Sequence, residues 1–108
     1  MYKALTRSQI DQPQTQIDKG YTDKFDSYDI VELIEFRYIS QTLVGRIGTY
    51  QGATAAENDN NHIDLTQVVF TKEQLPAEIL TLAVQLREKL YVYAKNNIEK
   101  FANAQYVE

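Results

Sequence analysis

Apolar and polar residues alternate along the middle of the chain, with the period of two that half-buried strands show. Ile34–Tyr38 alternates strictly, and Leu43–Tyr50 is a second β-like run after residues 40–42, which could form a hairpin turn or a bulge. Ile63–Phe70 alternates at its start and is β-branched at its end. The pattern therefore predicts about three strands. An amphipathic helix across Asp29–Ser40 is the competing interpretation of the first run.

The C-terminal region has the spacing of an amphipathic helix instead. Pro76 suits the first turn of a helix, and from Ala77 onward apolar residues recur three, four or eight positions apart. A helix packed on one side of a small sheet needs one apolar stripe, and here a second stripe is available for a partner. The sequence thus predicts an α+β fold, a small antiparallel sheet packed against a long C-terminal helix. The first stripe comprises Ile79, Leu82, Leu86, Leu90, Tyr93 and Phe101, and the second comprises Leu80, Val84 and Tyr91.

The chain divides by composition into an N-terminal segment and one domain. Residues 1–27 are rich in Gln, Asp, Thr and Lys and have sparse apolar positions, so we expect an extended arm there. A length of 108 residues suits a single core, so residues 28–108 are expected to form one α+β domain. Small and polar residues between Gln51 and His62 predict a loop.

Charge and cysteine content narrow the classes of function. The net charge of −4 disfavours non-specific binding to DNA or to an anionic membrane, and no apolar run has the length of a membrane span. The absence of cysteine excludes disulfides and thiol chemistry. With no signal-peptide-like run at the start, we expect a cytoplasmic protein.

No motif in the chain predicts catalysis, a metal or a cofactor. His62, the only histidine, lies near Glu57, Asp59 and Asp64, but the spacing from Asp59 does not match a calcium loop. The glycines fit neither the dinucleotide-binding nor the Walker pattern. We therefore expect a protein that is not an enzyme and that holds no metal or cofactor.

One small-ligand site is suggested by two arginines in adjacent predicted strands. If they face each other, their guanidinium groups could bind a carboxylate or phosphate, and two nearby tyrosines could stack on a planar group. The alternative is that Arg37 pairs with Glu35 or Glu32 on a solvated sheet face. The candidate ligand-binding residues are Arg37, Arg46, Tyr38 and Tyr50.

Two functions follow from these surfaces. The first is an interaction module or small structural subunit, a homo-oligomer and most simply a dimer, whose contact includes Leu80, Val84 and Tyr91 and which could also bind another protein. Eight tyrosines suit such an interface. The second is a protein that binds or sequesters an anionic small molecule such as a nucleotide.

Overall fold

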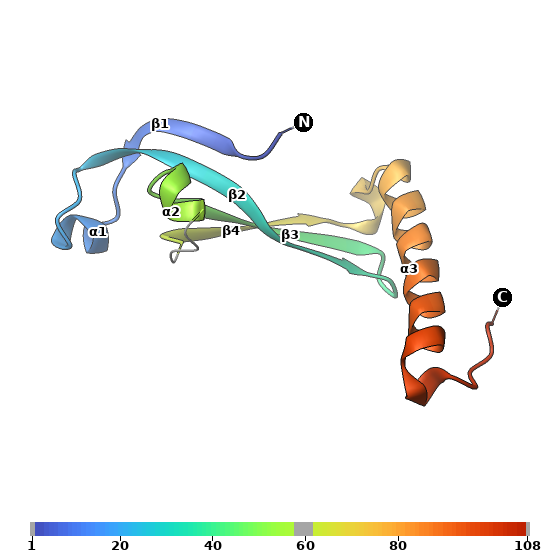
Figure 1. Cartoon of the computed structure of the whole chain (residues 1–108). Helices are drawn as coiled ribbons and strands as arrows, with labels where there is room; N and C mark the ends of the chain where they lie inside the picture. The colour runs from blue at the N-terminus through green and yellow to red at the C-terminus, as the bar shows by residue number, and fades with distance from the viewer. Residues whose placement is uncertain (1, 58–61, 108) are drawn as a thin grey trace. The chain divides into compact units, whose positions relative to one another are not determined.

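A computed structural model describes residues 2–57 and 62–107 of the protein. The chain forms two compact units, Met1–Thr71 and Lys72–Glu108. The first contains an antiparallel sheet and the second a long helix (Figure 1). The predicted α+β class is therefore confirmed, with four strands in place of about three. In the described ranges, no helix combines the length and apolar character needed to cross a membrane.

The sheet is a meander in which each strand pairs with the next along the chain. The pairs β1–β2, β2–β3 and β3–β4 are all antiparallel. β1 falls within the segment expected to be an extended arm, and that segment instead supplies an edge of the sheet. The region 29–40 is strand as far as Arg37, as the alternation predicts. The strands are β1 (Leu5–Asp11), β2 (Lys24–Arg37), β3 (Thr42–Tyr50) and β4 (Asp64–Phe70).

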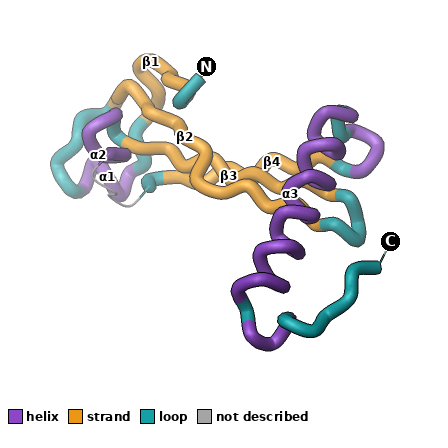
Figure 2. The backbone as a smooth tube through the Cα atoms, turned by 45° about the vertical axis from the view of Figure 1, so that its right-hand side comes forward, coloured by secondary structure: helices purple, strands orange, loops and turns teal. Residues whose placement is uncertain are grey.

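Two short helices accompany the sheet, α1 (Gln14–Asp18) and α2 (Ala53–Glu57). Both lie at the same end of the sheet, where the chain passes from β1 to β2 and from β3 to β4 (Figure 2). α2 lies within the stretch expected to be a loop, because Ala53–Glu57 is a short run of good helix formers. The remainder of that predicted loop, residues 58–61, lies outside the described residues.

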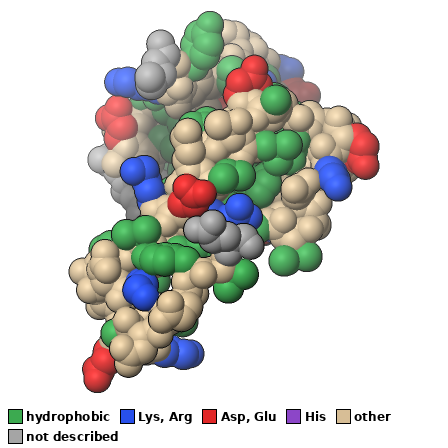
Figure 3. Space-filling model, turned by 90° about the vertical axis from the view of Figure 1, so that its right-hand side faces the viewer, with side chains coloured by type: hydrophobic (Ala, Val, Ile, Leu, Met, Phe, Trp, Pro, Cys, Tyr) green, Lys and Arg blue, Asp and Glu red, His purple; other side chains and the backbone are tan. Residues whose placement is uncertain are grey.

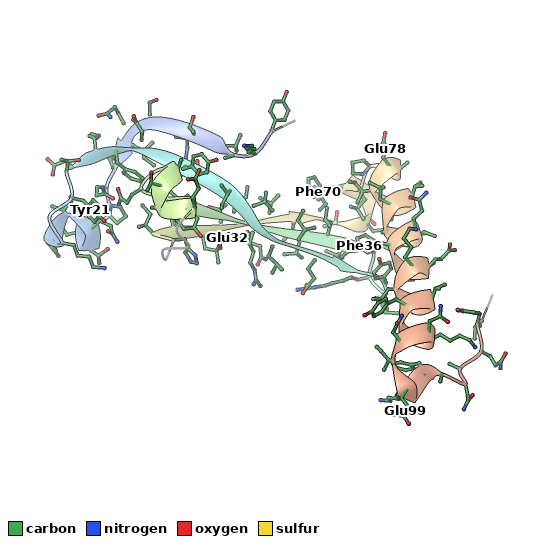
Figure 4. All side chains as sticks on the ribbon, in the orientation of Figure 1. Tyr21, Glu32, Phe36, Phe70, Glu78 and Glu99 are labelled. Carbon is green, nitrogen blue, oxygen red and sulfur yellow. The ribbon has the colours of Figure 1, made fainter. Side chains whose placement is uncertain are left out.

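A β-bulge in β2 changes which residues share a face. Val31 pairs with Ile47 and Leu33 pairs with Arg46, so Glu32 is an extra residue that has no paired residue on β3. The side-chain alternation is displaced by one position beyond it. As a result, one face near the β2–β3 turn is strongly apolar, and Figure 4 shows Phe36 and Phe70 at this end of the sheet. The registers assign to this face Ile34, Phe36, Leu43, Gly45, Val68 and Phe70.

The sheet unit has a small core with a large polar share. Its buried hydrophobic residues are Phe25, Val44 and Tyr50, whereas much of the apolar surface near the β2–β3 turn is exposed. The buried polar residues are at least as numerous as the apolar ones. They are Gln12, Ser27, Asp29 and Thr49.

The second unit consists of η1 (Lys72–Gln74), α3 (Ala77–Asn97), η2 (Glu99–Phe101) and the residues that follow. Pro76 is the N-cap of α3 and has an extended backbone, so the predicted helix start is confirmed. After η2 the chain turns back along α3. Lys95 donates a hydrogen bond to the Ala104 carbonyl, and its ammonium group lies 5.2 Å from the centre of the Tyr106 ring.

Candidate functional site

The structure separates the two arginines of the predicted ligand site. Arg37 pairs across the hairpin with Thr42, and Arg46 pairs with Leu33. Leu33 and Arg37 are four positions apart, about 13 Å along a strand. The two arginines therefore do not lie opposite each other in the hairpin. Arg37 instead donates from Nε to the Glu35 carboxylate at 2.7 Å, as the alternative interpretation held.

The two tyrosines of that set also lie apart. Tyr38 follows the end of β2 and packs edge-to-face on Phe36, with ring centres 4.8 Å apart. Tyr50 ends β3, is buried, and donates its hydroxyl hydrogen bond to Glu32. The four residues therefore form no common pocket. An anion bound by Arg37 or Arg46 alone stays a prediction.

A first polar cluster, here called the Glu32 cluster, forms around the bulge residue. Bulges re-aim side chains, and this one directs the Glu32 carboxylate over Gly48 toward Tyr50 and His62. His62 Nδ1 lies 3.4 Å from Glu32 Oε2, and the His62 and Tyr50 rings are perpendicular at 6.5 Å. Glu32, Gly48, Tyr50 and His62 make up this cluster. The lone histidine thus has as its acidic neighbour a residue thirty positions away in the sequence.

Beside the Glu32 cluster lies a half-open cavity of about 390 Å³. Figure 4 shows Tyr21 and Glu32 on this part of the sheet unit. The cavity has a mixed polar and apolar lining that includes Lys19, Tyr21, Gln51, His62 and Ile63. Among residues 2–57 and 62–107, no group of three His, Asp or Glu side chains is placed to hold a metal ion.

A second polar cluster, here called the Asp29 cluster, links three strands. Asp29 of β2 is only 5% exposed, and its carboxylate accepts hydrogen bonds from side chains on β1, β2 and β3. Arg7 binds it through two nitrogens, each at 2.9 Å. The hydroxyl groups of Ser27 and Thr49 donate to it at 2.9 and 2.7 Å. The bidentate geometry is the strongest form of an arginine–carboxylate pair.

The hydrogen bonds to Asp29 favour its charged form. The Arg7 guanidinium lowers the pKa of Asp29, with further lowering from the Thr49 and Ser27 hydroxyl groups, and burial opposes these effects only in part. Arg7 itself remains about half exposed. The Asp29 cluster therefore links three strands, and its contribution to the stability of the sheet depends on pH.

The surface of α3 is the third candidate site. Of its 21 residues, all of which the structure describes, only Ala83 is buried. The predicted contact residues Val84 and Tyr91 are exposed and Leu80 is half-buried, and the first stripe is exposed except for the half-buried Ile79. In Figure 3, hydrophobic side chains lie at the surface among charged ones. The exposures range from 41% to 65% for Leu82, Val84, Leu86, Leu90, Tyr91, Val92 and Tyr93.

Near its C-terminal end, α3 and the returning chain form a half-open, largely apolar cavity of about 510 Å³. Tyr91, Phe101 and Tyr106 line it. One predicted contact residue, Tyr91, therefore borders both this cavity and the open helix surface.

Comparison with models of protein families, with curated proteins and with solved structures found no match for this chain. The assignment of function therefore depends on the geometry.

Sequence reasoning missed both polar clusters, and only weak signals could have found them. Arg7 lies in a polar segment without a clear period, so nothing placed it in a strand beside Asp29. The alternation of apolar and polar residues breaks on both sides of Glu32, where Ile30–Val31 and Leu33–Ile34 are consecutive apolar residues, and this break is the signal of a bulge. Gly48 is the other signal, because a strand glycine often marks a close approach.

The Gly48→Ala variant tests the Glu32 cluster. A Cβ at position 48 would lie 2.3 Å from Glu32 Oε1, so the carboxylate must move away from Tyr50. We expect the free energy of unfolding to fall by about 1 to 2 kcal/mol, because the Tyr50 hydroxyl loses its hydrogen bond to Glu32. Urea denaturation followed by tyrosine fluorescence measures this change.

Gly45→Ala on the same strand is the matched control, since the nearest atom to its added Cβ is 4.0 Å away. It should leave stability within about 0.5 kcal/mol of the parent. The double variant with Glu32→Gln and Gly48→Ala should have nearly the same free energy of unfolding as Gly48→Ala alone, because both substitutions remove the same contact between Glu32 and Tyr50. Equal effects of the two alanine variants would contradict the assigned role of Glu32.

The Asp29→Asn variant tests the Asp29 cluster through pH. Because the folded-state pKa of Asp29 is lowered, its stabilising effect is present above the unfolded value of about 3.9 and is lost as pH falls through the folded value. We expect Asp29→Asn to lower the unfolding free energy at pH 7 by about 1 to 3 kcal/mol. The loss should shrink as pH falls below about 4.

Urea titrations between pH 7 and 2 measure this dependence. Asp23→Asn, which makes the same change at an exposed strand-connecting position, is the control and should leave stability at pH 7 nearly unchanged. A constant difference between parent and Asp29→Asn at every pH would show that the carboxylate charge is not responsible.

Proposed function

We propose that this protein is a non-enzymatic structural subunit that self-associates through α3. The observation that carries the proposal is the exposure of large apolar side chains between Leu82 and Tyr93. Most helices in proteins are stabilised by packing an apolar face, and α3 buries only Ala83 among its own residues. A second copy would supply the missing contact. The cysteine-free sequence favours a cytoplasmic location.

The exposed apolar side chains of α3 lie on two faces of the helix. Leu82, Leu86, Leu90 and Tyr93 share one face, and Val84 and Tyr91 lie on the opposite face. Each face contains a tyrosine, and tyrosine is enriched in interface cores. Exposed apolar surface on both faces of a helix usually marks a contact site.

The charges of α3 favour a second copy that runs antiparallel. Glu78 lies in the first turn and Lys95 in the last turn. An antiparallel pair brings each acidic N-terminal end to a basic C-terminal end and also aligns opposite helix dipoles. A parallel pair would place like charges together at both ends.

The Val84→Glu variant tests this proposal. Val84 belongs to the predicted contact and is 41% exposed in the single chain, so a carboxylate there is tolerated by the fold but would be unpaired at an apolar interface. We expect the wild-type protein to be a dimer or larger assembly at micromolar concentration. We expect the dissociation constant to rise at least tenfold in the variant, a loss of about 1.4 kcal/mol or more. Analytical ultracentrifugation measures both.

Gln85→Glu is the matched control, because it adds the same charge one position away on an exposed polar side chain. It should associate like the parent, and circular dichroism should show equal helix content in all three proteins. A wild-type chain that stays monomeric at high micromolar concentration would overturn the proposal. So would equal weakening by both glutamates, which would indicate a general charge effect.

A further inference from the structure

The two edges of the sheet differ in their capacity to accept another strand. β4 forms one edge and β1 the other. An edge strand presents unpaired backbone N–H and C=O groups, and soluble proteins usually obstruct such groups with proline, lysine, a bulge or a very short strand. Only one of the two edges has such an obstruction.

The β1 edge is interrupted. Its register with β2 shifts between Arg7 and Ile10, and Gln9 has a φ of 49°, in the left-handed region. Asp26 holds this irregularity in place by accepting hydrogen bonds from both the backbone N–H and the side-chain amide of Gln9, at 3.0 and 3.1 Å. A straight incoming strand cannot pair continuously with this edge.

The β4 edge is continuous. All seven residues pair with β3 without a register shift, and all seven are exposed. The strand contains no proline, lysine or arginine, and Asp64 at its start is the only charged residue. Four of its side chains are large and apolar, and they are 37% to 43% exposed, namely Leu65, Val68, Val69 and Phe70.

We propose that β4 pairs antiparallel with β4 of a second copy of this chain, in a register centred on Gln67. The two sheets then become one continuous eight-stranded sheet across a two-fold axis. The bulged β1 edge excludes the alternative β4–β1 pairing, which would generate an open polymer. This contact is separate from the α3 surface, so it adds a second interface to the proposed subunit.

The five central side chains of β4 are complementary to themselves in this register, and Asp64 at each end lies opposite Phe70. Leu65 faces Val69 of the second copy and Thr66 faces its Val68, which are favourable cross-strand pairs. Gln67 faces Gln67, and two amides can hydrogen-bond to each other. The two Asp64 carboxylates lie at opposite ends of the pair, about 20 Å apart. Parallel in-register pairing would place them side by side, and like charges in that position are destabilising.

The same register places the apolar faces of both copies on one side of the joined sheet. Residues directly opposite in an antiparallel pair point to the same side of the sheet. With the centre at Gln67, Val68 lies opposite Thr66 of the other copy and Phe70 lies opposite its Asp64. The exposed apolar regions beside the two β2–β3 turns would therefore lie on one side of the joined sheet, at opposite ends of the β4 pair.

A single introduced cysteine tests this contact directly, because the chain has no cysteine of its own. In Gln67→Cys the two thiols would lie opposite each other, with Cβ atoms about 4.5 to 5.5 Å apart, near disulfide range. Thr6→Cys, at an exposed position on the bulged β1 edge, is the matched control. Both variants are oxidised at low micromolar concentration, and the disulfide-linked dimer is followed on non-reducing gels. We expect Gln67→Cys to cross-link at least tenfold faster.

The experiment is repeated with Val84→Glu added, so that failure of the α3 contact can be told apart from failure of the β4 contact. Cross-linking at position 67 should persist in that background. A rate equal to that of Thr6→Cys in both backgrounds would overturn the proposal. Hydrogen exchange of the unmodified protein gives an independent check. The amides of residues 64–70 should be more protected at high than at low protein concentration, and protection that does not depend on concentration would also overturn it.

Discussion

The buried carboxylate of Asp29 is the interaction on which the sheet unit most depends. It accepts hydrogen bonds from Arg7 of β1, from Ser27 of its own strand and from Thr49 of β3, so one ionised group fixes three strands together. The apolar core of this unit is small, and hydrophobic burial alone offers limited stabilisation. A buried charged group lowers the stability of the fold unless hydrogen bonds satisfy its lone pairs. The hydrogen bonds that Asp29 accepts from three side chains meet this requirement.

Because the apolar core is small, many apolar residues remain available for binding. Few apolar residues are used inside, and many remain on the surface of the sheet near the β2–β3 turn and along α3. Each unit therefore has its own set of exposed apolar side chains. A soluble protein tolerates such surfaces best when association covers them. In the assembly, the proposed contacts through α3 and β4 would cover apolar side chains that a single copy leaves exposed.

The sequence could predict the elements with strong periodicity but not the contacts made by polar residues. The β2–β3 hairpin, β4 and α3 could be predicted because their apolar residues recur with a period of two in the strands and of three to four in the helix, and because Pro76 marks the helix start. β1 could not be predicted, because its residues are mostly polar and its position depends on partners such as Asp29 rather than on a pattern. The separation of Arg37 from Arg46 depends on hairpin register, which the turn around Gln41, with its φ of 54°, fixes and which composition does not reveal.

The bulge at Glu32 also governs how this chain can vary over time. Residues before and after it are out of phase, because one strand contains an extra position. Loss of that one residue would leave Val31 opposite Ile47 and Leu33 opposite Arg46, so Ile34 and Phe36 would keep their face of the sheet. A descendant that lost it would keep the apolar and polar positions of the hairpin arm and would lose the side chain that reaches Tyr50 and His62. A one-residue gap at this point in an alignment would therefore be accompanied by an unchanged alternation of apolar and polar residues up to the turn.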